Sequence, residues 1–145
     1  MKLFNMKSYP DSGMLILRAG VGFIFIFIHG LSKITGGPEM WSKLGKSMSN
    51  FGINFYPEFW GFMSAVTEFF VPMLIIAGFL FRPAALLLTF NMVVATTVHL
   101  KNLDPWGKIA YPMLLIILFI SMFLTGPGKY SLDEYFKRRR SKNEI

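Results

Sequence analysis

The sequence predicts an all-α integral membrane four-helix bundle, and three observations carry this prediction. Hydrophobic residues make up 53% of the 145 residues, whereas charged residues make up only 16%. A soluble domain carries about 25% charged residues. Four apolar stretches approach or reach the length of roughly 20 residues that a bilayer span requires. They do not alternate polar and apolar residues, as the strands of a membrane β-barrel would. The whole chain, residues 1–145, is therefore expected to be a single membrane domain.

The first span is expected at about residues 14–31, before the turn sequence Gly36-Gly37-Pro38. Lys2 and Lys7 precede it, as they would in a signal peptide. The stretch is too long for that, however, and no small-residue cleavage pattern follows it, so a retained helix is expected. After it, apolar residues recur at steps of three and four from Trp41 to Phe51. This spacing predicts a short amphipathic helix lying in the outer membrane interface.

The other spans are expected at about residues 59–81, 84–100 and 107–125. Pro72 lies inside the second span, where a kink is expected. Arg82 and Pro83 form a tight connection, with Pro83 suited to the first position of the third span. Beyond the fourth span, Ser131 and Glu134 have the spacing of a capping box, which predicts a short helix in the basic tail of residues 132–145.

The charge balance favours a membrane surface over nucleic acid as the partner of the basic residues. Fifteen Lys and Arg residues against eight Asp and Glu residues give a net charge of +7. With four spans, ten of the basic residues fall on the side of the two termini and five on the other side. The positive-inside rule then places both termini in the cytoplasm. The expected location is a bacterial-type cytoplasmic (inner) membrane, which the chain crosses several times. Contact with lipid or a partner protein is expected from Lys137, Arg138, Arg139 and Arg140.

Ionisable side chains inside the apolar stretches are the candidates for function, because burying them in a bilayer is costly. They are Arg18, His29, Glu68 and His99. At 1.5 Å per residue, Glu68 lies roughly 13 Å inside its span, whereas both histidines lie close to the outer ends of theirs. We therefore expect one outer-facing pocket that holds Glu68 and both histidines, with Lys33 at its mouth. Arg18 shares a helix face with His29 and joins the candidate ligand-binding residues.

Each of these residues also has a structural interpretation. Glu68 pairing with Lys33 or His29 would join two helices, Arg18 would reach the inner headgroups, and His99 would be an interfacial histidine. Two histidines with a carboxylate suit a metal, and two histidines suit a haem iron, but no spacing makes either ligand set specific. No metal site is therefore predicted. The chain has no cysteine, which excludes thiolate chemistry and Cys-ligated clusters within it.

Five short segments, taken in order, resemble the DoxX family of small four-helix membrane proteins. They are Leu17-Arg-Ala-Gly20, His29-Gly30-Leu-Ser-Lys33, Glu68, Gly78-Phe-Leu-Phe-Arg82-Pro83-Ala84 and Gly126-Pro-Gly-Lys-Tyr-Ser-Leu-Asp133. The resemblance spans Leu17 to Asp133. Its matching positions are Arg18, His29, Lys33, Glu68, Arg82 and Asp133.

The resemblance implies membrane redox systems, including subunits linked to quinone-dependent oxidation. The leading hypothesis is a quinone-linked redox subunit acting with a partner protein that carries the electron-transfer cofactor. In this hypothesis Glu68 and His29 relay protons, and His29, Lys33, Glu68, His99 and Arg18 contact the ligand. Quinone is the favoured cofactor, ahead of haem or a metal. The alternative is a non-catalytic subunit that assembles or anchors a larger complex. A transporter is disfavoured because four spans show no internal repeat. A homo-oligomer stays open.

Overall fold

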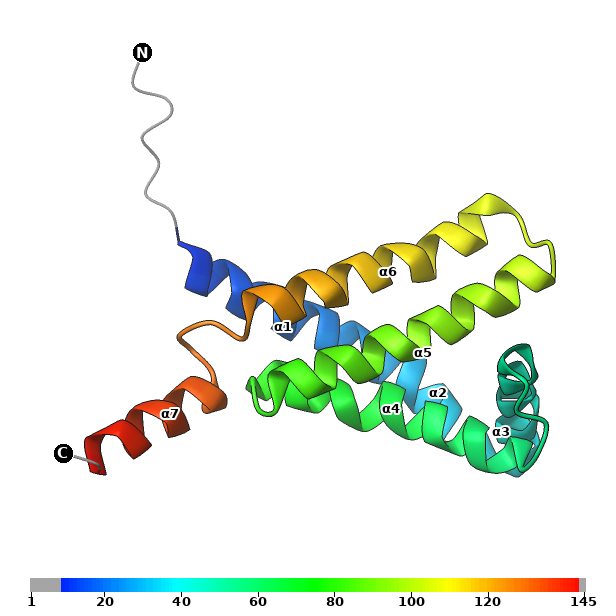
Figure 1. Cartoon of the computed structure of the whole chain (residues 1–145), viewed down its shortest axis with the longest axis horizontal. Helices are drawn as coiled ribbons and strands as arrows, with labels where there is room; N and C mark the ends of the chain where they lie inside the picture. The colour runs from blue at the N-terminus through cyan, green and yellow to red at the C-terminus, as the bar shows by residue number, and fades with distance from the viewer. Residues whose placement is uncertain (1–8, 144–145) are drawn as a thin grey trace, which may run out of the picture.

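The computed structural model describes residues 9–143 (Figure 1), and four of its helices are long and apolar enough to cross a membrane. The first runs from Pro10 to Ile34 and consists of three segments: α1 (Pro10–Ile24), the π-helical turn η1 (Phe25–Gly30) and α2 (Leu31–Ile34). The other three are α4 (Pro57–Ala77), α5 (Phe81–Lys101) and α6 (Trp106–Thr125). All four lie where the sequence places apolar stretches, so the helical membrane bundle is confirmed. The π-helical turn was not predicted.

Three shorter helical segments lie at the two ends of the bundle. At one end are α3 (Gly37–Gly45) and the 3₁₀ turn η2 (Lys46–Phe51), which together occupy the region predicted to be amphipathic. At the other end is α7 (Leu132–Asn143), which projects away from the four long helices (Figure 1). The main-chain N–H of Glu134 donates to Ser131 Oγ at 3.2 Å, as the capping pattern predicts. These are called the α3 end and the α7 end below.

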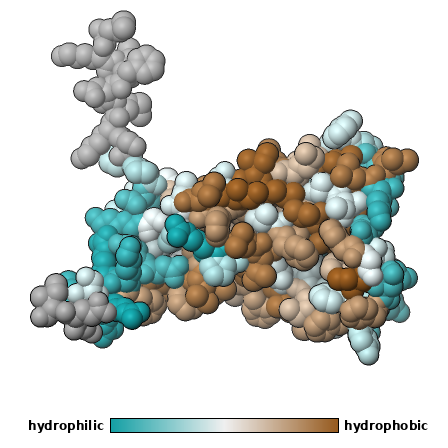
Figure 2. Space-filling model, in the orientation of Figure 1, coloured by the Kyte–Doolittle hydropathy of each residue, from teal (hydrophilic) through white to brown (hydrophobic). Residues whose placement is uncertain are grey.

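Large apolar side chains divide between the interior of the bundle and its surface. Phe25, Ile75, Phe81, Leu88 and Phe119 are fully buried and form the centre of the core. The surface also carries many exposed large apolar side chains. Soluble monomeric proteins rarely expose large contiguous apolar patches. On the visible face, hydrophobic residues occupy the middle and hydrophilic residues gather at both ends (Figure 2). This banding suits a bundle whose middle is surrounded by lipid.

Two glycines let α3 lie directly against the backbone of α4. A Cβ atom on Gly45 would collide with the carbonyl of Pro57, and one on Gly61 would collide with the carbonyl of Trp41. The indole Nε1 of Trp41 also donates to the carbonyl of Lys33 at 2.8 Å. These contacts fix α3 across the start of α4, where it forms one wall of a cavity.

Candidate ligand-binding cavity

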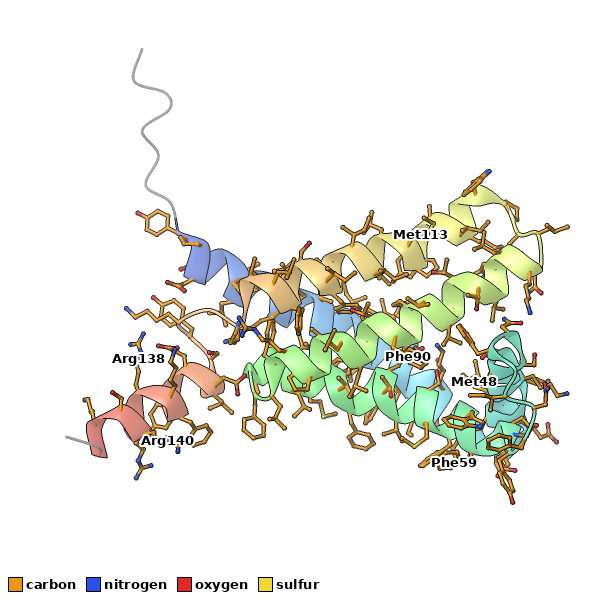
Figure 3. The ribbon with its side chains drawn as sticks, in the orientation of Figure 1. Met48, Phe59, Phe90, Met113, Arg138 and Arg140 are labelled. Atoms are coloured by element: carbon orange, nitrogen blue, oxygen red, sulfur yellow. The ribbon has the colours of Figure 1, made fainter. Side chains whose placement is uncertain are left out.

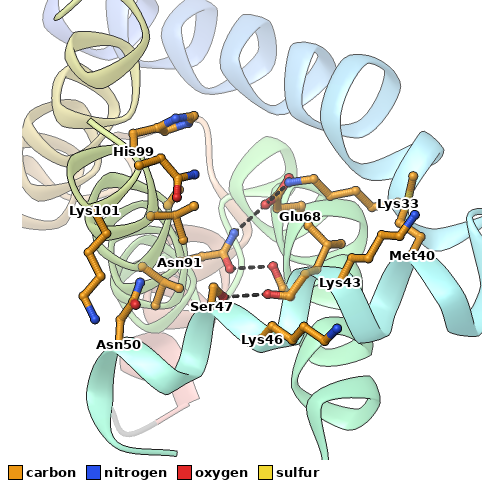
Figure 4. A pocket seen from close by; sticks show the side chains of 16 residues that line it. Lys33, Met40, Lys43, Lys46, Ser47, Asn50, Glu68, Asn91, His99 and Lys101 are labelled. Carbon is orange, nitrogen blue, oxygen red and sulfur yellow. Dashed lines mark hydrogen bonds and ion pairs between the residues drawn. The ribbon is translucent and has the colours of Figure 1, made fainter. Parts of the chain in front are cut away.

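A cavity of about 670 Å³ opens at the α3 end, between α3 with η2 on one side and α4 and α5 on the other (Figure 4). Its walls are largely apolar and include Leu44, Val94 and Val98. Polar side chains from α2, α4 and α5 converge on it: Lys33, Ser64, Glu68, Asn91 and His99. Six further polar or charged residues from α3, η2 and the end of α5 also line it: Lys43, Lys46, Ser47, Asn50, Lys101 and Asn102. Apolar walls with a few convergent polar groups are typical of a small-molecule site.

The Glu68 carboxylate is the centre of the polar cluster. Its side chain is only 3% exposed, and Lys33 Nζ lies 2.5 Å from both of its oxygens. Asn91 Nδ2 donates to Glu68 Oε1 at 2.6 Å, and Asn91 Oδ1 accepts from Ser64 Oγ at 2.8 Å. The buried charge is thus paired and hydrogen bonded, which is the condition for burying it without a large penalty. The cluster joins α2, α4 and α5.

The backbone explains why Lys33 reaches this carboxylate. A Cβ atom on Gly30 would lie 2.5 Å from the carbonyl oxygen of Glu68, so only glycine lets η1 approach α4 this closely. Lys33 follows three residues later, on the same side of the helix. On α4, Ser64 and Glu68 are four residues apart and therefore share the face that lines the cavity. One of the predicted alternatives, a Lys33–Glu68 pair joining two helices, is present.

His99 lines the cavity near the end of α5 and is tied to the loop that follows. Its Nδ1 lies 2.8 Å from Asp104 Oδ2, and Lys108 Nζ lies 3.6 Å from Asp104 Oδ1. The hydrogen bond from His99 lowers the pKa of Asp104 below its usual value, against a smaller opposing effect of burial, and the positive charge of Lys108 adds to the lowering. Asp104 was not among the predicted site residues, although its spacing of five residues from His99 could have indicated the pair.

His29 does not line the cavity, unlike the expectation of one pocket for Glu68 and both histidines. Its Nε2 lies 2.8 Å from the Tyr111 hydroxyl on α6, and its ring packs 5.3 Å from that of Phe25. The π-helical turn places His29 on the side of the helix that faces α6. Tyr111 was also missed, although it carries the one polar side chain between Ile109 and Ile120.

Arg18 lies at the α7 end of the bundle and does not line the cavity that it was expected to join. It is only 2% exposed. Its Nη1 donates to the carbonyl of Pro127 at 3.2 Å, and its Nη2 donates to the carbonyl of Tyr130. The side chain therefore does not line the cavity, and it is buried rather than directed outward to headgroups. It turns inward because the loop after α6 offers carbonyl acceptors inside the protein.

A family model described as DoxX matches residues 13–100, which run from α1 almost to the end of α5. The chain belongs to the DoxX family. The match contains the whole Lys33–Glu68–Asn91 cluster and His99. Comparison with curated proteins and with solved structures gives no match.

Five of the six family-like positions of this DoxX protein separate into two groups at opposite ends of the bundle, and the sixth, His29, faces Tyr111 on α6. Lys33 and Glu68 belong to the cavity. Arg18, Arg82 and Asp133 contact main-chain groups at the α7 end. The two Asp133 carboxylate oxygens each accept one N–H at 2.9 Å, from Leu80 and Phe81, at the start of α5. These three residues tie side chains to the main chain at the α7 end of the bundle.

Within residues 9–143, no three His, Asp or Glu side chains are grouped closely enough to hold a metal.

The basic residues Lys137 to Arg140 lie on α7, and Figure 3 shows Arg138 and Arg140 on opposite sides of that helix. Arg138 Nε donates to Glu134 Oε1 at 2.8 Å.

Proposed function

We propose that this DoxX-family membrane protein is a quinone-linked redox subunit that acts with a partner protein. The observation that carries the proposal is a cavity with apolar walls and a buried, hydrogen-bonded carboxylate, placed at one end of a membrane bundle. A quinone head matches this chemistry because it is a flat apolar ring with two oxygen atoms at its edge. The volume of about 670 Å³ lies within the range of small-molecule sites.

The chain supplies binding groups and proton acceptors in this proposal, and the partner supplies the electron acceptor. A bound quinol releases two electrons and two protons when it is oxidised to the quinone, and both electrons pass to the redox group of the partner. Lys33 and Asn91 offer N–H donors that orient a ligand oxygen. The Glu68 carboxylate accepts one proton, and the second is released to water at the cavity mouth, beside the exposed Lys43 and Lys101.

His29 remains a proposed onward acceptor for the proton on Glu68. His29 directly precedes Gly30, which packs against the main chain of Glu68. Its hydrogen bond with the Tyr111 hydroxyl would fix the ring orientation and the tautomer. This arrangement supports a path from the cavity toward α6, in which Tyr111 acts as a positioning residue.

The test is the quinone content and turnover of the full chain purified in mild detergent with its partner. We expect about one extractable quinone per chain, and a loss of turnover of about 10²-fold or more in Glu68→Gln. The matched control is Glu58→Gln, which makes the same change at an exposed position of the same helix and is expected to leave turnover unchanged. Unchanged turnover in both Glu68→Gln and His29→Gln would refute the proton relay.

A non-catalytic assembly or anchoring subunit is the second candidate, and α7 is the observation that favours it. This helix carries the basic run Lys137 to Arg140 and projects from the bundle, where a protein partner can reach it (Figure 1). A protein without extractable quinone that purifies with a stoichiometric partner would favour this role. Removal of residues 132–145 would then release the partner, whereas in the redox proposal the cavity keeps its quinone.

We further propose that both termini lie in the cytoplasm, as the distribution of Lys and Arg indicates. Because the chain has no cysteine, single cysteines report the topology directly. In intact cells, an impermeant maleimide is expected to label cysteines at Lys46 and Asp104 but not at Pro83 or Ser141. Labelling of a cysteine at Pro83 or Ser141 would contradict the proposed orientation.

A further inference from the structure

A second hollow, of about 680 Å³, opens at the α7 end, opposite the cavity. Cationic side chains from three separate elements line it: Arg82 at the start of α5, Lys129 in the loop after α6, and Lys137 and Arg138 on α7. We call this the basic hollow. It shares no lining residue with the cavity.

The three carboxylates in the basic hollow already have hydrogen-bond donors. Asp11 Oδ1 accepts the main-chain N–H of Lys129 at 2.8 Å, and Asp133 accepts two main-chain N–H groups at the start of α5. Glu134 accepts from Arg138. The side-chain cations of Arg82, Lys129 and Lys137 take part in no ion pair within residues 9–143. Arg82 also donates its Nε to the carbonyl of Phe123 at 3.3 Å. Its terminal nitrogens and the ammonium groups of Lys129 and Lys137 remain to contact an anionic ligand, in a lining that holds four cations against three carboxylates.

The loop that carries Lys129 is held in place from inside the protein. Arg18, almost fully buried, donates to the carbonyls of Pro127 and Tyr130 on either side of Lys129. The bond from the Lys129 N–H to Asp11 fixes the same segment to α1. A site held in this way loses little conformational freedom when a ligand binds. The buried arginine thus gives the basic hollow a rigid wall.

The basic hollow also lies at the ends of two of the candidate membrane spans. Arg82 is the second residue of α5, and Lys129 follows the last residue of α6 by four positions. Phe79, Leu80 and Tyr130 are exposed beside it. Aromatic and basic side chains at the ends of spans are typical of the headgroup region. The hydrophilic end of the bundle that bears α7 borders the hydrophobic band directly (Figure 2).

We infer that the basic hollow binds the phosphate of an anionic phospholipid headgroup through Arg82, Lys129 and Lys137. Guanidinium and ammonium groups donate charge-assisted hydrogen bonds to phosphate oxygens, and the acyl chains would lie against the exposed apolar side chains next to the hollow. This is a defined site rather than the general attraction of a basic tail. Arg139 and Arg140 do not line it, and Figure 3 shows Arg140 on the side of α7 away from Arg138.

The test is native mass spectrometry of the full chain in detergent, titrated with dioleoylphosphatidylglycerol, dioleoylphosphatidylcholine or inorganic phosphate. We expect one phosphatidylglycerol bound about tenfold or more tightly than phosphatidylcholine, and no binding of inorganic phosphate at the same concentration. The triple variant Arg82→Gln, Lys129→Gln, Lys137→Gln is expected to lose this preference. The matched control, Arg139→Gln, Arg140→Gln, Lys142→Gln, removes the same charge from outside the hollow and is expected to keep it.

Three outcomes would overturn the inference. Equal affinity for the two lipids would exclude a headgroup site, and an equal loss in the control triple would leave only diffuse charge attraction. Binding of inorganic phosphate as tight as that of phosphatidylglycerol would assign the site to a free anion. Should the first triple fail to fold, the single variant Lys129→Gln decides, because it alters one exposed side chain and is expected to weaken phosphatidylglycerol binding about threefold or more.

Discussion

The Lys33–Glu68 pair joins two helices across the cavity, and its contribution can be measured with a double-mutant cycle. In Lys33→Met, the carboxylate stays 97% buried with only Asn91 as its remaining donor, because the Glu68 side chain is 3% exposed. Removing one partner of a buried pair costs about 3–5 kcal/mol of unfolding free energy. In Glu68→Gln, the ammonium is left behind, but the Lys33 side chain is 26% exposed and can turn toward water. We therefore expect a smaller loss, of about 1–3 kcal/mol.

The double variant is expected to be more stable than the sum of the two losses predicts. With a neutral glutamine beside a methionine, no unpaired charge remains, and the bond from Asn91 is kept. The coupling free energy should be about 2 kcal/mol, within the range for residues in direct contact. The assay is unfolding of the full chain in mixed micelles with increasing sodium dodecyl sulfate, followed by tryptophan fluorescence.

Additive losses would refute the reasoning, because they would mean that the two side chains do not stabilise each other. The variant Glu68→Asp separates structure from proton transfer. If Glu68→Gln fails to accumulate and Glu68→Asp is tolerated, the carboxylate acts as a structural link between α2 and α4. If Glu68→Gln and Glu68→Asp both fold and the turnover of Glu68→Gln falls, the proposed proton transfer gains support.

Three further predictions follow from single contacts. Gly61→Ala drives a Cβ atom into the carbonyl of Trp41 and should cost about 1–3 kcal/mol in the same unfolding assay, whereas Gly20→Ala, with no atom within 4 Å, should stabilise α1 by about 0.5–1 kcal/mol. Equal effects would contradict the close approach of α3. Asp133→Asn replaces one acceptor oxygen by a donor at the start of α5 and should cost about 1–2 kcal/mol, with faster proteolysis of the loop before α7 as the second measurement. The pKa of Asp104 is lowered in the folded protein, so its contribution to stability is present above its usual value of 3.8 and is lost as the pH falls through the lower folded value. The thermal unfolding temperature should fall across that window in the wild type, and Asp104→Asn should remove this part of the pH dependence.

The long helices could be predicted because a span needs only length and apolar composition, both of which are local properties of the chain. Capping of α7 by Ser131 is local in the same way, since the donor and acceptor are three residues apart. The π-helical turn escaped prediction, because it depends on how η1 packs against α4 at Gly30. A change of one residue in helical register there decides which side chain faces which neighbour.

The candidate site could be predicted only as a set of residue types. Charged side chains inside apolar stretches are conspicuous in any sequence, so Glu68, His29 and Arg18 were identified. Lys33, 35 residues from Glu68, was predicted as one of two alternative partners of its carboxylate. The partner of His29 was not predicted, because Tyr111 is 82 residues away along the chain. Arg18 shows the limit most clearly, since its acceptors are carbonyls 109 and 112 residues along the chain.

The sequence by itself determined that this is a four-helix membrane protein of the DoxX family, with a net positive charge and buried ionisable groups that need partners. Only the tertiary structure decided how those groups are distributed. It selected Lys33 rather than His29 as the partner of Glu68, added Asn91 to that pair, turned His29 toward Tyr111, and used Arg18 to hold the loop at the opposite end. The physical reason is that the composition of each helix specifies what must be removed from water. The packing of α4 against η1, α3 and α5, through glycines at the contacts, specifies which polar groups meet once they are removed.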